Sequence, residues 1–286
     1  MTLPTSPGGA ELPVPLKDAL RARLEGELVL PLLPDTAARV IAACQNESSE
    51  VEELNELIKR DPSLAAHILR IANSAAYAPR VPILTLQQAI GRVGLATVGD
   101  IAVAVALKER VFSVPGHQAR LHDLWQHSLA TACYAKEISV LLRGDLESAF
   151  LCGLLHDVGM AITLQVVCDL ERERVVPTVL SATLEAAMLE FHCEFGAKFA
   201  EAWRLGPWIS AVIRHHHEPA GARFRPDEIG IIALADGLAY WALEAGKTEE
   251  DFQAEPRFGF VRLHEGGLKM LLRKRELVLQ QVAALA

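Results

Sequence analysis

Residues 146–164 read LESAFLCGLLHDVGMAITL, an apolar segment with His156 and Asp157 near its middle. The apolar spacing predicts one helix over this segment. Consecutive residues on a helix lie about 100° apart, so the two side chains flank one metal ion only if the helix presents its edge to the site. Gly153 and Gly159 stand on either side of the pair and would permit close packing there.

Helical spacing continues along nearly the whole chain, and strand-like alternation is almost absent. Asp61-Pro62 and Thr85 are expected to begin two helices, because a capping side chain and a proline at the first position favour helix starts. Residues 171–180 are the main ambiguous stretch. Further helices are predicted over residues 96–110, 119–141, 181–204, 207–217 and 227–244, so the fold class is all-α.

The two ends of the chain differ from this helical part. Residues 1–27 are expected to be an N-terminal extension, since the first 14 residues are rich in proline and glycine and show little periodicity. Residues 246–286 are predicted to form a polar linker followed by a helix. A single large helical region is therefore expected between about residues 28 and 245.

The composition of the chain argues against several classes of function. Of 286 residues, 51% are hydrophobic and 22% are charged, as in a globular protein, and the formal net charge of -8 argues against nucleic-acid binding. The chain has no long uncharged apolar run and no basic start followed by an apolar core, so no membrane association and a cytoplasmic location are expected. The five cysteines are scattered without a CxxC pair. Cys152 lies one helical turn before His156 and Cys193 follows His192, so either thiolate is a conceivable ligand, but a small buried thiol is the preferred interpretation for both.

Histidines and aspartates are spread over several predicted helices. Asp123 and His127 are four residues apart and share a helix face. Asp236 ends an apolar run, where a carboxylate is costly unless a cation compensates its charge. Mixed nitrogen and oxygen ligands suit manganese, iron, zinc or cobalt better than calcium. The run 215–217 cannot point one way, so His216 and His217 are interpreted as inward and His215 as outward.

A simpler explanation treats each histidine as a hydrogen-bonded core residue. We accept it for the histidines without an evident set of partners, namely His67, His117, His122 and His264. For His127, His156, Asp157 and Asp236 a metal site is preferred, because four separate coincidences would otherwise need explaining.

Three segments resemble a known family: DPSLAAHILRIANSAAY at 61–77, ILTLQQAIGRVG at 83–94 and EFHCEFGAKFAEAWRLGPWISAVIRHHHEP at 190–219. They are similar to the HDOD subgroup of the HD superfamily of helical metal-dependent phosphohydrolases. The resemblance covers about residues 28–245. It implies an HD-like helical bundle at 118–245 with an N-terminal helical layer at 28–113.

The resemblance extends to the metal ligands of the related HD-GYP cyclic di-GMP phosphodiesterases. It implies a ligand set of Asp123, His127, His156, Asp157, His192, His216, His217 and Asp236. Two features depart from those enzymes. Met160 follows Gly159 where they have a lysine, and AGARFRPDE at 220–228 replaces their DGxGYP signature. These departures weigh against cyclic di-GMP hydrolysis.

The HDOD resemblance implies a bacterial signal-transduction module that binds one or two divalent transition-metal ions and acts through an unidentified signalling protein. Iron or manganese is expected first, with zinc as the alternative, and a nucleotide or phosphate is a candidate ligand. The alternative function is a metal-dependent phosphohydrolase acting on a nucleotide or phosphodiester. In that case Asp157 is the expected catalytic residue.

Overall fold

Helices are the regular secondary structure, with no strand, in the part of the chain that the computed structural model describes. That part comprises residues 12–26, 28, 30, 34–45, 51–74, 77, 79, 81–143, 146–244, 248, 252, 261 and 263–285. The helices are α1 Val14–Glu25, α2 Asp35–Gln45, α3 Val51–Ile58, α4 Pro62–Ala72, α5 Leu86–Val93, α6 Leu95–Arg110, α7 Gln118–Leu142, α8 Leu146–Leu155, α9 Val158–Arg172, α10 Ser181–Ala202, α11 Pro207–His215, the 3-10 turn η1 Pro219–Gly221, α12 Pro226–Leu243, α14 Glu265–Arg273 and α15 Arg275–Leu285.

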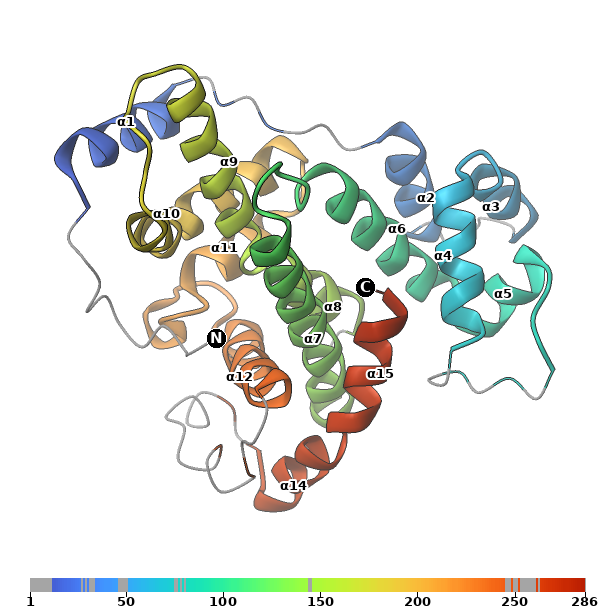
Figure 1. Cartoon of the computed structure of the whole chain (residues 1–286). Coiled ribbons are helices and arrows are strands. Elements are labelled where there is room, and N and C mark those ends of the chain that lie inside the picture. The colour runs from blue at the N-terminus through green and yellow to red at the C-terminus, as the bar shows by residue number, and fades with distance from the viewer. Residues whose placement is uncertain are drawn as a thin grey trace.

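The helices form a small N-terminal layer beside a larger bundle (Figure 1). In the layer, α2 packs on α6 and α3, while α4 packs on α5 and α6. In the bundle, α7 packs between α8 and α12, and α10 packs on α9 and α11. Helix α6 also contacts α8 and so joins the two parts. The predicted all-α class, with a helical layer and an HD-like bundle, is confirmed.

Two predicted helix starts in the layer are confirmed in detail. The Asp61 carboxylate accepts a hydrogen bond of 3.0 Å from the Leu64 backbone N–H, with Pro62 at the first helical position. The Thr85 hydroxyl accepts one of 3.2 Å from the Gln88 N–H. Local chemistry alone therefore fixes where α4 and α5 begin.

The prediction of one helix over residues 146–164 is wrong. Helix α8 ends at Leu155, His156 and Asp157 form a turn, and α9 begins at Val158. The apolar spacing continues across the turn, so the sequence pattern does not reveal the break. The turn lets α8 pack on α7 while α9 packs on α10.

The stretch at 171–180 contains no strand. Helix α9 continues to Arg172, and an irregular segment leads to α10 at Ser181. The Glu171 side chain accepts a hydrogen bond from the Val179 N–H and so closes this connection.

Both ends of the described chain pack on the bundle. Helix α1 lies within the range expected as an extension, and its buried Leu16, Leu20 and Leu24 face α9 and α10. The single helix expected near the C-terminus is two helices, α14 and α15. Helix α15 packs on α7 and on α4, and therefore touches both the bundle and the layer.

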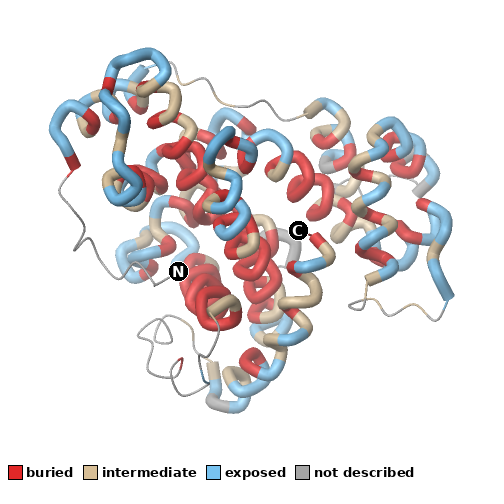
Figure 2. Tube along the Cα trace, viewed as in Figure 1, coloured by how far each residue is buried: buried red, intermediate tan, exposed pale blue. Residues whose placement is uncertain are grey.

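Burial is concentrated in the central helices (Figure 2). By length and composition the stretch Ala149–Arg172 would be able to cross a membrane, and the bent pair α5 and α6 passes the same test together. Protein covers 89% of the most apolar window in Ala149–Arg172, as is usual for a helix in a protein core.

Candidate metal centre

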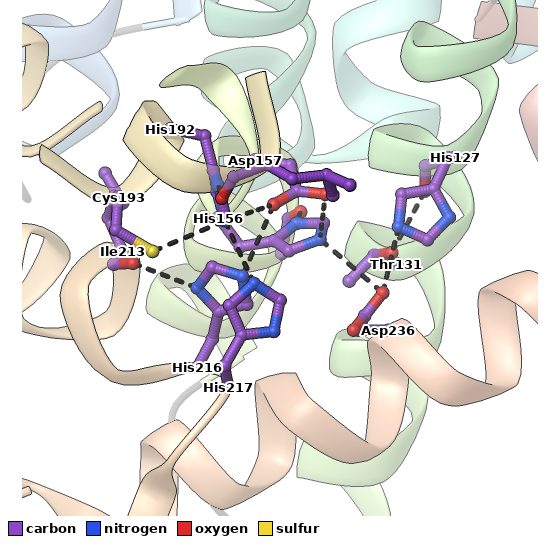
Figure 3. Close-up of polar contacts among 12 residues, drawn as sticks. His127, Thr131, His156, Asp157, His192, Cys193, Ile213, His216, His217 and Asp236 are labelled. Carbon is purple, nitrogen blue, oxygen red and sulfur yellow. Dashed lines mark hydrogen bonds and ion pairs between the residues drawn. The ribbon is translucent and has the colours of Figure 1, made fainter. Parts of the chain in front are cut away.

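Imidazoles and carboxylates from five parts of the fold meet in the bundle (Figure 3). His127 comes from α7, His156 and Asp157 from the turn between α8 and α9, and His192 from α10. The remaining members follow α11 or lie on α12: His216, His217 and Asp236. All of these residues except His217 are buried, with exposed fractions of 3% or less. Such a concentration of buried polar groups requires compensation.

The carboxylate of Asp157 lies at the middle of the cluster. Its Oδ1 is 3.3 Å from His216 Nε2 and 3.5 Å from His192 Nε2, and its Oδ2 is 3.4 Å from His156 Nε2. Three imidazoles from three segments therefore direct the same ring nitrogen at one carboxylate.

Asp236 contacts two histidines on the other side of the cluster. Its Oδ1 lies 3.0 Å from His127 Nε2 and 3.7 Å from His156 Nε2. The His127 ring also packs on Tyr240, with ring centroids 4.1 Å apart. His156 thus lies between the two carboxylates.

Backbone carbonyls fix the orientation of three of the rings. The Nδ1 of His156 lies 2.7 Å from the Gly153 oxygen, that of His192 2.8 Å from the Leu189 oxygen, and that of His216 2.9 Å from the Ile213 oxygen. A carbonyl accepts only, so each Nδ1 must donate, and in a neutral ring the Nε2 then holds a lone pair. Metal-binding histidines are commonly held in this way.

The two carboxylates remain ionised. Burial opposes this, but the neighbouring His156 and His216 hold the pKa of Asp157 well below its usual range, and His127 and His156 do the same for Asp236. Burial lowers the pKa of His156, yet Asp157 and Asp236 outweigh it and raise that pKa to about 10. For His192, burial dominates and lowers the pKa. The cluster is therefore an anionic pocket that favours cations.

The residues fit a metal ion. Two sets have all their ligand atoms within 4.8 Å of one another: His127, His156 and Asp157 in one, and His192, Cys193, His216 and His217 in the other. In addition, His156 Nε2, His216 Nε2 and Asp157 Oδ1 are buried without a hydrogen-bond partner. A divalent cation would satisfy these atoms together.

The structure gathers seven of the eight residues of the predicted ligand set and leaves out Asp123. That side chain is exposed and belongs to neither set. Four residues along a helix correspond to a rise of about 6 Å, and Asp123 lies that far from His127 toward the solvent-exposed start of α7. Sharing a helix face with His127 is therefore not enough to bring Asp123 into the cluster.

The structure also gives the positions of Cys193 and of the histidines at 215–217. Cys193, which the sequence favoured as an ordinary buried thiol, is half-buried and lies with its Sγ 3.3 Å from His192 Nε2. His217 is exposed but directs its Nε2 to within 2.9 Å of His192 Nε2, while His215 belongs to neither ligand set. In the sequence, the adjacency of Cys193 to His192 was the signal that this thiol could lie beside the cluster.

The fold and this cluster define a class: an all-helical protein with a buried His/Asp centre able to hold a divalent metal. The HDOD domain profile matches residues 30–219, and the chain belongs to the HDOD family. The resemblance recognised in the sequence is confirmed.

Solved structures share the fold over nearly the whole chain. An HDOD domain protein of unknown function from Geobacter sulfurreducens is 24% identical, with a TM-score of 0.68 over 94% of this chain and 96% of that one. Two Shewanella amazonensis proteins also match. One, provisionally named a metal-dependent phosphohydrolase, is 20% identical with a TM-score of 0.72 over 95% of this chain and 98% of its own. The other, provisionally named a phosphohydrolase, is 25% identical with a TM-score of 0.70 over 94% and 98%.

A curated relative is an uncharacterised protein of Treponema pallidum. It is 25% identical over an alignment of 238 residues that covers 80% of this chain. The chain spans 45% of the length of that relative.

Proposed function

We propose that this HDOD protein is a signal-transduction module that binds one or two divalent transition-metal ions and acts through contact with another protein. The observation that supports it best is the convergence of His156, His192 and His216 on the Asp157 carboxylate, each ring held by a backbone carbonyl. Iron or manganese suits the mixed nitrogen and oxygen ligands, and zinc is the alternative.

A binding module agrees better with the surroundings of the cluster than an enzyme does. A phosphate ester would have to reach Asp157, whose side chain is only 5% exposed. The residue after Gly159 is the buried, uncharged Met160, which offers no cation to a substrate phosphate. Metal occupancy would instead stiffen the contacts among α7, α9, α10 and α12, and α8, which packs on α7 and α12, would pass that change to α6 of the N-terminal layer.

The first experiment is elemental analysis of protein purified without added metal, compared with two variants. Asp157→Asn removes the carboxylate charge that faces three imidazoles, and the content of iron and manganese is expected to fall at least about tenfold. Asp123→Asn is the matched control and should keep wild-type metal content, because Asp123 is exposed outside both ligand sets. Equal metal content in wild type and Asp157→Asn would overturn the proposal.

A second experiment tests the signalling part. Amide hydrogen exchange in α2 to α6 should slow when the purified protein is loaded with manganese. Exchange that slows only around the ligands, with the layer unchanged, would argue against transmission to a partner through the layer.

A metal-dependent phosphohydrolase is the second candidate, and one observation favours it. His217 is exposed and contacts buried His192, so the cluster has one side that reaches solvent. A bound divalent metal would polarise a phosphoryl oxygen there. Hydrolysis of bis(p-nitrophenyl) phosphate or of a cyclic dinucleotide by the metal-loaded protein, lost in a folded Asp157→Ala variant, would establish this function in place of the module.

A further inference from the structure

We infer that His192, Cys193, His216 and His217 form a second cation site of their own, in which the Cys193 thiolate is a ligand and zinc is the preferred ion. The inference rests on the proposed metal binding by the cluster and adds to it the identity of one ligand and one metal. It assigns the Cys193 thiol the ligand role that the sequence ranked below an ordinary buried thiol.

The geometry of the four side chains carries the inference. The Nε2 of His192 has three close neighbours: His217 Nε2 at 2.9 Å, Cys193 Sγ at 3.3 Å and Asp157 Oδ1 at 3.5 Å. The ring of His216 packs against those of His192 and His217, with centroids 5.5 Å and 4.0 Å away. The ligand atoms of the four residues all lie within 4.8 Å of one another.

Hydrogen bonds alone do not satisfy this arrangement. The Nδ1 atoms of His192 and His216 already face backbone carbonyls, so the Nε2 atoms are the ones left to coordinate a metal. His192 Nε2 faces a nitrogen, a sulfur and a carboxylate oxygen at once, and His216 Nε2 is buried without a hydrogen-bond partner. A cation between the four groups would satisfy all of them together.

The donor set selects the ion. One thiolate and three imidazoles match the tetrahedral nitrogen and sulfur ligands of zinc, whereas manganese and magnesium prefer oxygen. Ideal zinc bond lengths place tetrahedral nitrogens about 3.4 Å apart, and nitrogen and sulfur about 3.6 Å apart. The present separations of 2.9 Å and 3.3 Å would need to open by only a few tenths of an ångström.

The second site differs chemically from its neighbour. His127, His156 and Asp157 offer nitrogen and oxygen, and Asp157 Oδ1 also touches His192 and His216. The Asp157 carboxylate therefore lies between a harder site with nitrogen and oxygen ligands and a softer site with nitrogen and sulfur ligands. The half-buried Cys193 and exposed His217 give the softer site a path to solvent, and on binding the Cys193 thiol releases its proton to the solvent.

Cobalt substitution of the full-length protein tests this assignment. Cobalt(II) replaces zinc and gives a thiolate-to-cobalt charge-transfer band in the near ultraviolet only when sulfur is a ligand. Wild type is expected to show this band, Cys193→Ser to lose it, and the matched control Cys168→Ser to keep it, since half-buried Cys168 belongs to neither ligand set. The zinc affinity of this site should fall at least about tenfold in Cys193→Ser.

Protection from alkylation gives a second measurement on the unmutated protein. Zinc should slow iodoacetamide modification of Cys193 at least about tenfold relative to Cys168, as measured by mass spectrometry. Cobalt binding with visible ligand-field bands but no sulfur band, together with unprotected Cys193, would overturn this inference and leave the His/Asp metal site standing. The absence of any cobalt binding would overturn the proposed metal site itself.

Discussion

At the scale of single residues, His156 has the most constrained position in the cluster. Its side chain is fully buried, its Nδ1 is held by the Gly153 carbonyl, and its Nε2 lies between Asp157 and Asp236. The two carboxylates raise its pKa to about 10 although burial lowers it, so the ring holds a proton at neutral pH when no metal is bound. Proton and metal therefore compete for one position.

This competition predicts that metal binding depends on pH. A metal ion must displace the His156 proton, so apparent manganese affinity should rise with pH, by about tenfold per unit for each proton released. The measurement is isothermal titration from about pH 6 to about pH 8, with proton release followed in weak buffer. Cys193→Ser should still release the His156 proton. Affinity that is independent of pH would show that His156 is not a ligand.

At the scale of helices, two glycines let the turn at His156 and Asp157 approach its neighbours. A Cβ on Gly159 would lie 1.8 Å from the His192 carbonyl oxygen and 2.7 Å from the Gly196 nitrogen. A Cβ on Gly153 would lie 2.6 Å from the Ala132 Cα. Both obstacles are backbone atoms, so α9 and α8 pack this closely on α10 and α7 only because these positions have no side chain.

Gly159→Ala should therefore disturb fold and site together. The added methyl group would push α9 away from α10 and shift His192, costing about 2–4 kcal/mol of unfolding free energy and reducing metal content. Gly91→Ala is the matched control: it lies in α5, where the added Cβ would meet nothing within 4 Å beyond its chain neighbours and its own helix backbone, and it should be neutral or stabilising by about 0.5–1 kcal/mol. Urea unfolding and elemental analysis check both. Wild-type stability and metal content in Gly159→Ala would contradict the packing argument.

At the scale of the whole molecule, α15 holds the N-terminal layer against the bundle. Val278, Val282 and Leu285 on this helix are buried. At the junction it lines a cavity of about 70 Å³ together with Ser74 of the layer and Lys136 of the bundle. The metal ligands come from other elements, so α15 affects how the parts fit together rather than the composition of the site.

Removing residues 275–286 should weaken the packing of the layer on the bundle and leave the metal site intact. Loss of the three apolar side chains is expected to cost about 3–6 kcal/mol of unfolding free energy. Amide exchange in α4 should become faster, because α15 covers that helix. Metal content per folded chain should stay at the wild-type level. Loss of metal without loss of stability would show instead that the C-terminal helix acts on the site.

The sequence by itself determined the all-α class, the helix starts at Asp61 and Thr85, and the family. Capping and apolar periodicity are local, and the motif residues can be recognised without coordinates. It also pointed to His127, His156, Asp157 and Asp236 as a set, because an aspartate in an apolar helix needs a compensating charge.

Only the tertiary structure decided the break after Leu155, the position of Asp123 outside the His/Asp cluster and the position of Cys193 beside it. A helical repeat describes neighbours three and four residues apart on one element. The helical repeat does not indicate at which point along its axis a helix contacts other helices. Nor does it indicate which side chains of those helices lie at the contact. Those relations come from packing between segments distant in sequence, and here that packing brings three imidazoles to the Asp157 carboxylate.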